Sequence, residues 1–414
     1  MKNAIKLVIA VLVAVIVTVP LEAQTTPTGT RITWTQVADS TFTRDRGPYN
    51  RDDSTIRTVA YGTGVYVAGG HEAKLAYSTD NGVTWTQVGN HPIMTDSTYI
   101  DRNSSSPVNV IIHDGSKFIA AGWRRDNWGT GRVVTVRGSS TVMSSVNGRT
   151  WTNMQWADWQ NTESLQGIAH GEGKYVIVGN DVNGRMHFGI GDIGRNIDGN
   201  WNGRGWGTTP TVPPLSDVAY GGGKFIIVGQ GGTILPITNI TRPPDSGRSY
   251  AITSTAITGA NPFGTSAILA ITYGNGRFVA VGEGGRSAYS ADGLRWTASS
   301  NNAFGTNNIN AVTYGGGLFL AVGDNGRMAY SSDGASWTQV ADSSFGSTAV
   351  NGVTWGNGRF VAVGNDGKIA YSNQLEPAVT IPQTQAPTPA PTPSPRPSRD
   401  AGRPEEPAPS PSRR

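Results

Sequence analysis

Tryptophan and arginine side chains gather in two short stretches of the sequence, WRRDNW (123–128) and WADW (156–159). Indole rings stack on the C–H faces of sugars and on extended peptides, and guanidinium groups donate several hydrogen bonds. These residue types favour binding over bond-breaking chemistry. We therefore predict a ligand site made of Trp123, Arg124, Arg125, Trp128, Trp156 and Trp159. The alternative is that the rings only pack long loops against the domain.

The sequence contains no clear catalytic motif. No phosphate-binding loop or nucleophile elbow is present, and HEAK (71–74) lacks the second histidine of a zinc-binding helix. Glycoside hydrolysis needs two carboxyl groups roughly 5–10 Å apart, and no local motif proposes such a pair. We expect no catalytic residue, no metal site and no cofactor, while a hydrolase built from distant residues stays open.

An internal repeat supplies the elements that must position the tryptophans. Seven segments each contain an apolar strand that ends in glycine, such as YVIVGN and FVAVGE. The marker glycines are Gly69, Gly122, Gly179, Gly229, Gly282, Gly323 and Gly364. The last units are the shortest, and the earlier ones carry insertions.

Each unit is predicted to form four antiparallel strands. In one short unit, strand-like runs at 309–314, 318–323, 327–332 and 336–341 are separated by the turns GGG, DNG and DGA. Small sheets of this kind bury both faces when copies pack radially. The sequence therefore predicts an all-β fold, a seven-bladed β-propeller of four-stranded antiparallel blades. An open array or a β-sandwich is the alternative.

The two ends of the repeat region complete one blade in this prediction. The seventh unit has three strands and then continues into QLEPAVTIPQ (374–383), whereas TWTQVA (33–38) matches the fourth strand of other units. An N-terminal strand that completes the last blade would leave no open edge.

The hairpins STDNGVTW (78–85), SADGLRW (290–296), SSDGASW (331–337) and the weaker SSVNGRTW (144–151) resemble the Asp-box, or bacterial neuraminidase repeat. The whole unit is similar to the propellers of photosystem II assembly factors and of sialidase-like secreted bacterial proteins. The resemblance implies that the box residues stabilise turns on the face opposite any active site. It implies a function only weakly, because the repeat occurs in glycosidases, receptors and assembly factors.

A sialidase would also require an arginine triad, a tyrosine nucleophile with a glutamate, and an aspartate acid/base. The sequence offers RIT (31–33) beside the closing strand, and Arg286, Arg327 and Lys368 recur at one repeat position. We expect these three cations to be structural and the protein to be non-catalytic. The histidines His113 and His170 replace a repeated tyrosine, so we expect them to pack rather than to react.

Propeller topology predicts where the tryptophans lie. The connection from the second to the third strand of a blade opens on the same face as the link to the next blade. WRRDNWGTGR (123–132) is expected to be such a loop and MQWADWQNTES (154–164) such a link. Links also repeat a phenylalanine, at Phe42, Phe263, Phe304 and Phe345. Repetition favours packing for these rings, with repeated shallow binding sites as the alternative.

The two ends of the chain are predicted to lie outside the domain. Residues 1–23 read as a signal peptide, with Lys2 and Lys6, an apolar run and Ala23, although an uncleaved anchor is the alternative. Residues 24–374 form the propeller, and residues 375–414 form a disordered proline-rich tail. Without these ends the domain is nearly neutral, so we expect no nucleic-acid partner.

These features together predict an exported, non-catalytic β-propeller that binds a glycan or protein at the cell surface or in the periplasm. We expect a monomer with no stable membrane insertion after signal cleavage. An assembly or scaffold factor is the alternative, and a sialidase-like glycoside hydrolase is the second.

Overall fold

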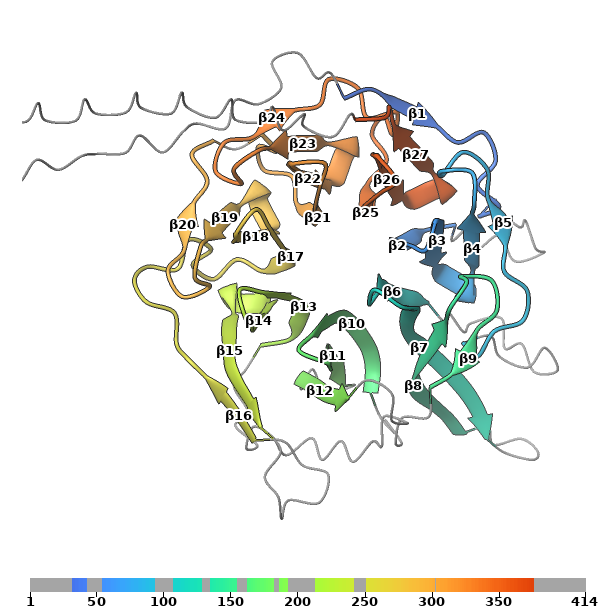
Figure 1. Ribbon diagram of the computed structural model, residues 1–414, viewed down its shortest axis with the longest axis horizontal. Coiled ribbons are helices and arrows are strands. Elements are labelled where there is room, and N and C mark those ends of the chain that lie inside the picture. The colour runs from blue at the N-terminus through green and yellow to red at the C-terminus, as the bar shows by residue number, and fades with distance from the viewer. Residues whose placement is uncertain are drawn as a thin grey trace, which may run out of the picture. The chain divides into compact units, whose positions relative to one another are not determined.

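The computed structural model describes residues 32–42, 54–93, 107–128, 135–154, 162–181, 186–192, 213–241, 251–301 and 303–375. All of them belong to one compact unit, Met1–Ala378. They form antiparallel sheets arranged in a ring, with one short strand of each sheet facing the centre (Figure 1). We number the sheets 1 to 7 by these inner strands.

The strands of sheets 1 to 4 follow the chain in order. Sheet 1 contains β2 (Ile56–Gly62), β3 (Val65–Gly70), β4 (Leu75–Ser78) and β5 (Thr86–Gln87). Sheet 2 contains β6 (Val108–His113), β7 (Phe118–Trp128), β8 (Thr135–Ser145) and β9 (Thr152–Asn153). Sheet 3 contains β10 (Thr162–Gly171), β11 (Lys174–Asp181) and β12 (Met186–Asp192). Sheet 4 contains β13 (Leu215–Gly221), β14 (Lys224–Gly229), β15 (Ile234–Thr241) and β16 (Ala251–Ser254).

Sheets 5 to 7 complete the ring. Sheet 5 contains β17 (Ile268–Gly274), β18 (Arg277–Gly282), β19 (Ser287–Ser290) and β20 (Thr297–Ala298). Sheet 6 contains β21 (Ile309–Gly315), β22 (Leu318–Gly323), β23 (Met328–Ser331) and β24 (Thr338–Gln339). Sheet 7 contains β25 (Val350–Gly356), β26 (Arg359–Gly364), β27 (Ile369–Ser372) and, from the other end of the chain, β1 (Trp34–Gln36).

The structure corrects the predicted blade count. The sequence predicts seven four-stranded blades, whereas the described residues form six, and sheet 3 has only three strands. A fourth strand for sheet 3 would fall in IGRNIDGNWNGRGW (193–206), which lies outside the described residues. Glycine and asparagine disfavour strands, so the repeat pattern alone overstated the evidence for a complete blade there. The all-β propeller class is confirmed.

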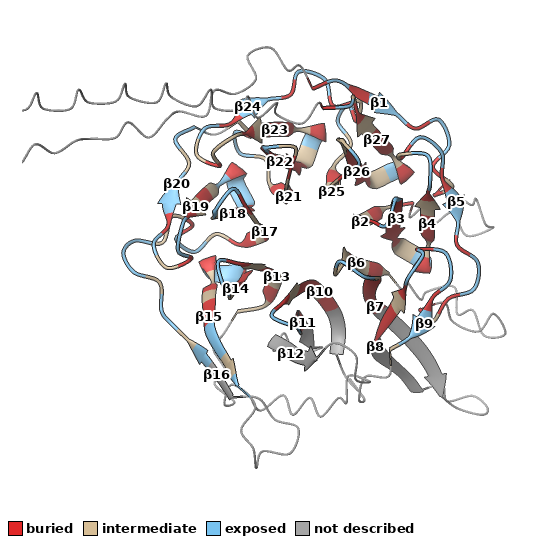
Figure 2. Cartoon of the chain, viewed as in Figure 1, coloured by how far each residue is buried: buried red, intermediate tan, exposed pale blue. Residues whose placement is uncertain are grey.

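Burial follows the order of strands in each sheet. Second strands such as β22 are buried along their whole length, as expected for apolar runs without alternation. The two-residue outer strands β5, β20 and β24 are exposed (Figure 2). The core therefore lies between neighbouring sheets rather than within any one of them.

A glycine and an aromatic ring form the joint between neighbouring inner strands. The inner strands contact one another in the cyclic order β2, β6, β10, β13, β17, β21, β25 and back to β2. At six of the joints, a Cβ added to the glycine would lie 1.9–2.2 Å from a ring atom of the next sheet. The pairs are Gly62 with His113, Gly171 with Tyr220, Gly221 with Tyr273, Gly274 with Tyr314, Gly315 with Trp355, and Gly356 with Tyr61.

The joint between sheets 2 and 3 uses a different contact. Asp114 occupies the position of the glycine, and its carboxylate accepts a hydrogen bond from the Tyr175 hydroxyl of sheet 3. Burial opposes ionisation of Asp114, but bonds from Tyr175 and from the Ser116 and Lys117 N–H groups outweigh it and lower its pKa to about 2. A charged hydrogen bond thus replaces close packing at this joint.

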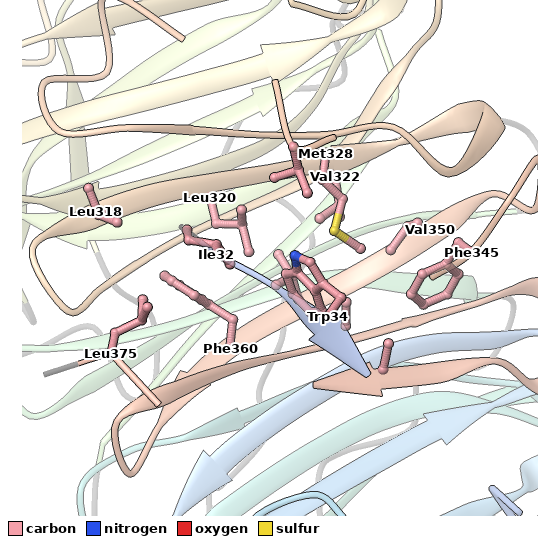
Figure 3. Close-up of a cluster of buried hydrophobic side chains, with 14 residues drawn as sticks. Ile32, Trp34, Leu318, Leu320, Val322, Met328, Phe345, Val350, Phe360 and Leu375 are labelled. Atoms are coloured by element: carbon pink, nitrogen blue, oxygen red, sulfur yellow. The ribbon is translucent and has the colours of Figure 1, made fainter. Parts of the chain in front are cut away.

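The N-terminal strand closes the ring as predicted. Trp34, Thr35 and Gln36 pair with Ser372, Tyr371 and Ala370 of β27. The chain ends also join through Thr33, whose N–H donates to Asn373 Oδ1 and whose carbonyl accepts from the Asn373 N–H, both at 2.9 Å. Figure 3 shows Trp34 and Ile32 among apolar side chains of sheets 6 and 7, including Leu320, Met328 and Phe360.

One residue of the predicted C-terminal tail, Leu375, lies among the described residues. Leu375, which the sequence places in the tail, is buried in the same apolar cluster as Trp34, and its N–H donates to the Gly358 carbonyl at 2.7 Å. The domain therefore extends at least to this residue. Residues 1–23 and 376–414 lie outside the described residues. Within the described ranges, no helix has the length and apolar run needed to cross a bilayer.

We predict that Trp34→Ala lowers the free energy of unfolding by about 3–5 kcal/mol, because it leaves a cavity between sheets 6 and 7. Thr35→Ala, on the exposed side of the same strand, is the control and should change stability little. Deletion of residues 32–38 should lower the melting temperature or produce oligomers. An unchanged, monomeric deletion variant in thermal unfolding and light scattering would contradict strand closure.

We also predict that Gly274→Ala destabilises the domain by about 1–3 kcal/mol or more, because its Cβ would lie 2.1 Å from Tyr314 Cγ. Gly89→Ala is the control, since an added Cβ there meets nothing within 4 Å. Urea unfolding of the two variants tests the glycine–aromatic joint, and equal stabilities would show that it does not constrain the ring.

Candidate functional site

Short turns and inter-sheet links form one face of the ring, which we call the link face. The turns are η1 (His71–Ala73), η3 (Gln230–Gly232), η4 (Glu283–Gly285), η5 (Asp324–Gly326) and η6 (Asn365–Gly367), each between a second and a third strand. Link side chains bond to them: His91 contacts the Ala73 carbonyl, Asn261 donates to Gly232, and Ser343 donates to Gly326. Turns and links therefore share a face, as predicted.

The repeated phenylalanines of the links are core residues. Phe42, Phe263, Phe304 and Phe345 are at most 2 % exposed. The recurring cations Arg286, Arg327 and Lys368 donate to the carbonyls of Pro262, Ala303 and Phe345, in the same links. The buried phenylalanines and the recurring cations thus both hold the links in place. The alternative that these phenylalanines form shallow ligand-binding sites is wrong, because their rings are buried.

A polar belt lies where the inner strands begin. Each of six inner strands has a register shift after its first residue, which leaves the second residue unpaired in the ladder. Such a bulge redirects a side chain. Arg57 Nη1 donates to Asn109 Oδ1 at 3.2 Å, and Asn310 and Asn351 donate to the carbonyls of Val350 and Ile56 in the next sheet. The belt joins sheets 6, 7, 1 and 2.

A hollow of about 460 Å³ opens on the link face between sheets 6 and 7. It is lined by Asp324 and Asn325 of η5, Asn365 and Asp366 of η6, and the link residues Ser347, Thr348 and Ala349. The belt fixes its floor: Asn310 Nδ2 donates to Asp324 Oδ1 at 3.0 Å, and Asn351 Nδ2 donates to Asn365 Oδ1 at 2.8 Å. All lining residues except Ala349 have polar side chains, and two of them are carboxylates, so the hollow suits a polar or cationic ligand.

The turn tips around this hollow differ from those on the far side of the ring. The central residue of each turn has positive φ, which glycine adopts most easily. Sheets 4 and 5 use Gly231 and Gly284 there, whereas sheets 6, 7 and 1 use Asn325 (φ 55°), Asp366 (φ 55°) and Glu72 (φ 52°). Polar side chains therefore replace glycine at three adjacent tips.

The predicted loop of sheet 2 is a strand instead. Residues Trp123 to Trp128 continue β7 and pair with Ser140 to Thr135 of β8, forming a hairpin arm (Figure 1). The reason lies in the sequence after Gly122, where WRRDNW contains no glycine or Asn-Gly pair to make the tight turn found in sheets 4 to 7. The prediction that Trp123, Arg124, Arg125 and Trp128 lie in a loop is wrong, although the arm still leaves the link-face end of sheet 2.

The other predicted binding residues, Trp156 and Trp159, lie outside the described residues. That they lie on the same face as Trp123 and Trp128 therefore stays a prediction. Sequence reasoning did not predict the hollow. Its residues come from the turns DNG and NDG and from the link between them, which the sequence analysis treated only as connections between strands. Alignment of the repeat units with one another could have found it, because QGG and EGG occupy the same position in sheets 4 and 5.

The opposite face carries the Ser-x-Asp and Ser-x-x-Gly turns. Asp80 accepts from the Thr84 N–H and from Ser78, and although burial opposes ionisation, these bonds outweigh it and lower its pKa. Trp85 Nε1 donates to the Gly82 carbonyl at 3.0 Å, and Trp151 and Trp296 repeat this contact. These residues stabilise turns. In the described part of the chain, no group of three or more His, Asp or Glu side chains could hold a metal ion.

Comparison with known proteins supports the fold. The family described as DUF6242 beta propeller domain matches residues 253–397, less than half of the chain. A search of curated proteins gave no match.

Three solved structures share the architecture. YCF48 bound to a D1 peptide is 15 % identical, with 82 % of this chain and 96 % of that chain covered and a TM-score of 0.51. YCF48 from Cyanidioschyzon merolae is 13 % identical, with 82 % and 98 % covered and a TM-score of 0.50. A catalytically inactive virginiamycin B lyase from Staphylococcus aureus, solved with quinupristin, is 12 % identical, with 83 % and 99 % covered and a TM-score of 0.51. At these identities the likeness is one of fold, so the chain is a β-propeller similar in architecture to both kinds of protein.

Proposed function

We propose that this protein is an exported, non-catalytic propeller that binds a segment of another protein on its link face. The observation that carries the proposal is the polar hollow between sheets 6 and 7. The Ser-x-Asp turns on the opposite face are, in this proposal, Asp-box repeats with a purely structural role. The protein acts as a monomer at the cell surface or in the periplasm.

The lining of the hollow favours a peptide over a neutral small molecule. Asp324 and Asp366 supply carboxylates on two different turns, and Asn325 and Asn365 add amide groups. A peptide offers backbone N–H groups along its length and, at lysine or arginine, a cation that carboxylates bind strongly. The belt beneath Asp324 and Asn365 holds both turns in place before binding, which lowers the entropic cost of association.

A structural neighbour gives independent support. YCF48 has been solved with a D1 peptide bound, so a propeller of this architecture can hold a peptide. The likeness does not transfer that ligand, and the peptide proposed for this chain is defined by the charge of its own hollow.

A glycan is the second candidate ligand because of the tryptophans of WRRDNW and WADW. Aromatic rings on the β7–β8 arm would stack on sugars. The arm and the hollow belong to different sheets, so variants at each site separate the two ligands.

We predict that Asp324→Asn combined with Asp366→Asn weakens peptide binding about tenfold or more, because each carboxylate contributes a charge-assisted hydrogen bond. Purified wild type and variant would be tested on an array of basic and acidic peptides, and on a glycan array in parallel. At position 324, asparagine keeps an oxygen that can accept the hydrogen bond from Asn310. At position 366, asparagine tolerates the positive φ, so both substitutions should preserve the fold.

Gln230→Ala, at the matching position of η3 in sheet 4, is the control and should bind as wild type does. Equal peptide binding by the Asp324/Asp366 variant would contradict the proposed site. Binding to glycans that is lost on Trp123→Ala, with no peptide binding at all, would favour the arm and a sugar ligand.

We also predict no turnover of sialosides or other glycosides by the wild-type protein, because Arg286, Arg327 and Lys368 are committed to link carbonyls. The virginiamycin B lyase neighbour shows that the architecture can host an enzyme, so the assay is informative. Hydrolysis above the rate of a heat-denatured control would contradict a purely binding role.

A further inference from the structure

The histidines of this chain are confined to one side of the ring. All five lie between His71 and His187, and the sequence from 213 to 375 contains none. Sheets 4 to 7 fill the matching positions with residues that do not titrate near neutrality. Tyr220, Tyr273, Tyr314 and Trp355 stand where sheets 2 and 3 have His113 and His170, and Asn261 and Ser343 contact turns as His91 does.

His113 is half-buried, and a second proton on its ring would displace an existing hydrogen bond. Its Nδ1 accepts the Gly115 N–H at 3.1 Å, so the neutral ring carries its proton on Nε2, which is buried without a hydrogen-bond partner. Protonation must occur at Nδ1 and would break the bond from Gly115. The ring also packs against Gly62 and against Phe118, at 4.8 Å between ring centroids. A buried charge without acceptors destabilises its surroundings.

His91 and His170 are in similar positions. His91 Nε2 donates to the Ala73 carbonyl at 2.8 Å, while Nδ1 is buried without a partner. His170 lies 4.9 Å from the Tyr175 ring centroid, and its Nε2 is buried without a partner. At His91 an added proton on Nδ1 therefore finds no acceptor.

Few charged groups lie close enough to these histidines to stabilise an added positive charge. Asp114 follows His113 directly but already accepts bonds from Tyr175, Ser116 and Lys117. Arg57 contacts both His71 and Asn109. Asn109 lies four residues before His113 on β6, which corresponds to about 13 Å, so Arg57 and His71 are far from the His113 ring. Near His170 are Glu172, which accepts from Tyr220, and Lys174; the turn beside His91 carries the ion pair of Lys74 with Glu72 at 3.4 Å.

The direction of the pH effect follows from burial. Burial lowers the pKa of His113 and His91, with Asp114 acting in the opposite direction on His113. The unfolded chain therefore takes up these protons first, and stability is lost as pH falls through about 6.5. Asp217 of β13 behaves oppositely. Burial raises the pKa of Asp217 to about 7, despite hydrogen bonds from the Ile271 and Val218 N–H groups. Its contribution to the stability of the folded state therefore increases as pH falls from 7.

We propose that sheets 1 to 3 form an acid-responsive half of the ring, which opens locally below about pH 6.5 while sheets 4 to 7 stay closed. Sheet 2 extends into the β7–β8 arm, so acidification also acts on the sheet whose second strand contains Trp123 and Trp128. The inference does not depend on the identity of any ligand.

Native-state hydrogen exchange on the full chain at pH 7.5 and pH 5.5 tests the proposal, after correction for the intrinsic pH dependence of exchange. At pH 5.5 the carboxylates of Asp80, Asp292 and Asp333, whose pKa values are lowered, remain ionised. We expect the opening constants of β2 to β12 to rise about tenfold for each unit by which the pKa of His91 or His113 is lowered. Those of β17 to β26 should stay constant or fall. Equal changes in both halves, or none, would overturn the proposal.

Two variants identify the histidines as the cause. His91→Asn, His113→Tyr and His170→Tyr together install residues that the other sheets use, and should abolish the difference between the halves. Tyr273→His places an imidazole against Gly221 and should transfer acid-dependent opening to sheets 4 and 5. If the triple variant does not fold, the single variant still decides, because unchanged exchange in sheets 4 and 5 would contradict the mechanism.

Discussion

The absence of a side chain at one position in six of the inner strands is the constraint on which the ring depends. Gly62, Gly171, Gly221, Gly274, Gly315 and Gly356 leave space that an aromatic ring or imidazole of the next sheet fills. This contact sets the distance between neighbouring inner strands, and the same ring packs on a phenylalanine or tyrosine of its own second strand. Packing between sheets is therefore coupled to packing within them.

The polar groups of the link face are organised by the same geometry. Once the inner strands are at a fixed spacing, the side chains at their bulges can reach the next strand, as Asn310 and Asn351 do. Those amides in turn hold Asp324 and Asn365 in the lining of the hollow. A hollow with fixed walls is thus a consequence of apolar packing at the opposite end of the strands.

Repetition made much of the fold predictable. The marker glycines located every second strand, and the match between TWTQVA and other fourth strands located the closing strand, because both signals depend on local spacing. The count of complete blades was not predictable from 193–206, where glycine and asparagine leave no strand signal. The β7–β8 arm was missed for the opposite reason: a polar, charged sequence was taken for a loop, although it pairs with β8 along its whole length.

The candidate site was less predictable than the fold. Sequence reasoning searched for unusual residues and found tryptophans, whereas the hollow is built from ordinary Asp, Asn, Ser and Thr side chains in turns. Only the ring brings η5, η6 and the intervening link together. Such a site is visible in sequence as a difference between repeat units, not as a motif.

The pairing of Trp34 with Ser372 has a consequence for how the protein is made. During synthesis β1 emerges before the other strands of the propeller and its partner β27 emerges after them, so β1 must wait, unpaired and carrying a large apolar ring, until all of the other strands have been made. Contacts between such distant residues slow folding. The final step of assembly is therefore the docking of the oldest strand of the propeller onto the newest.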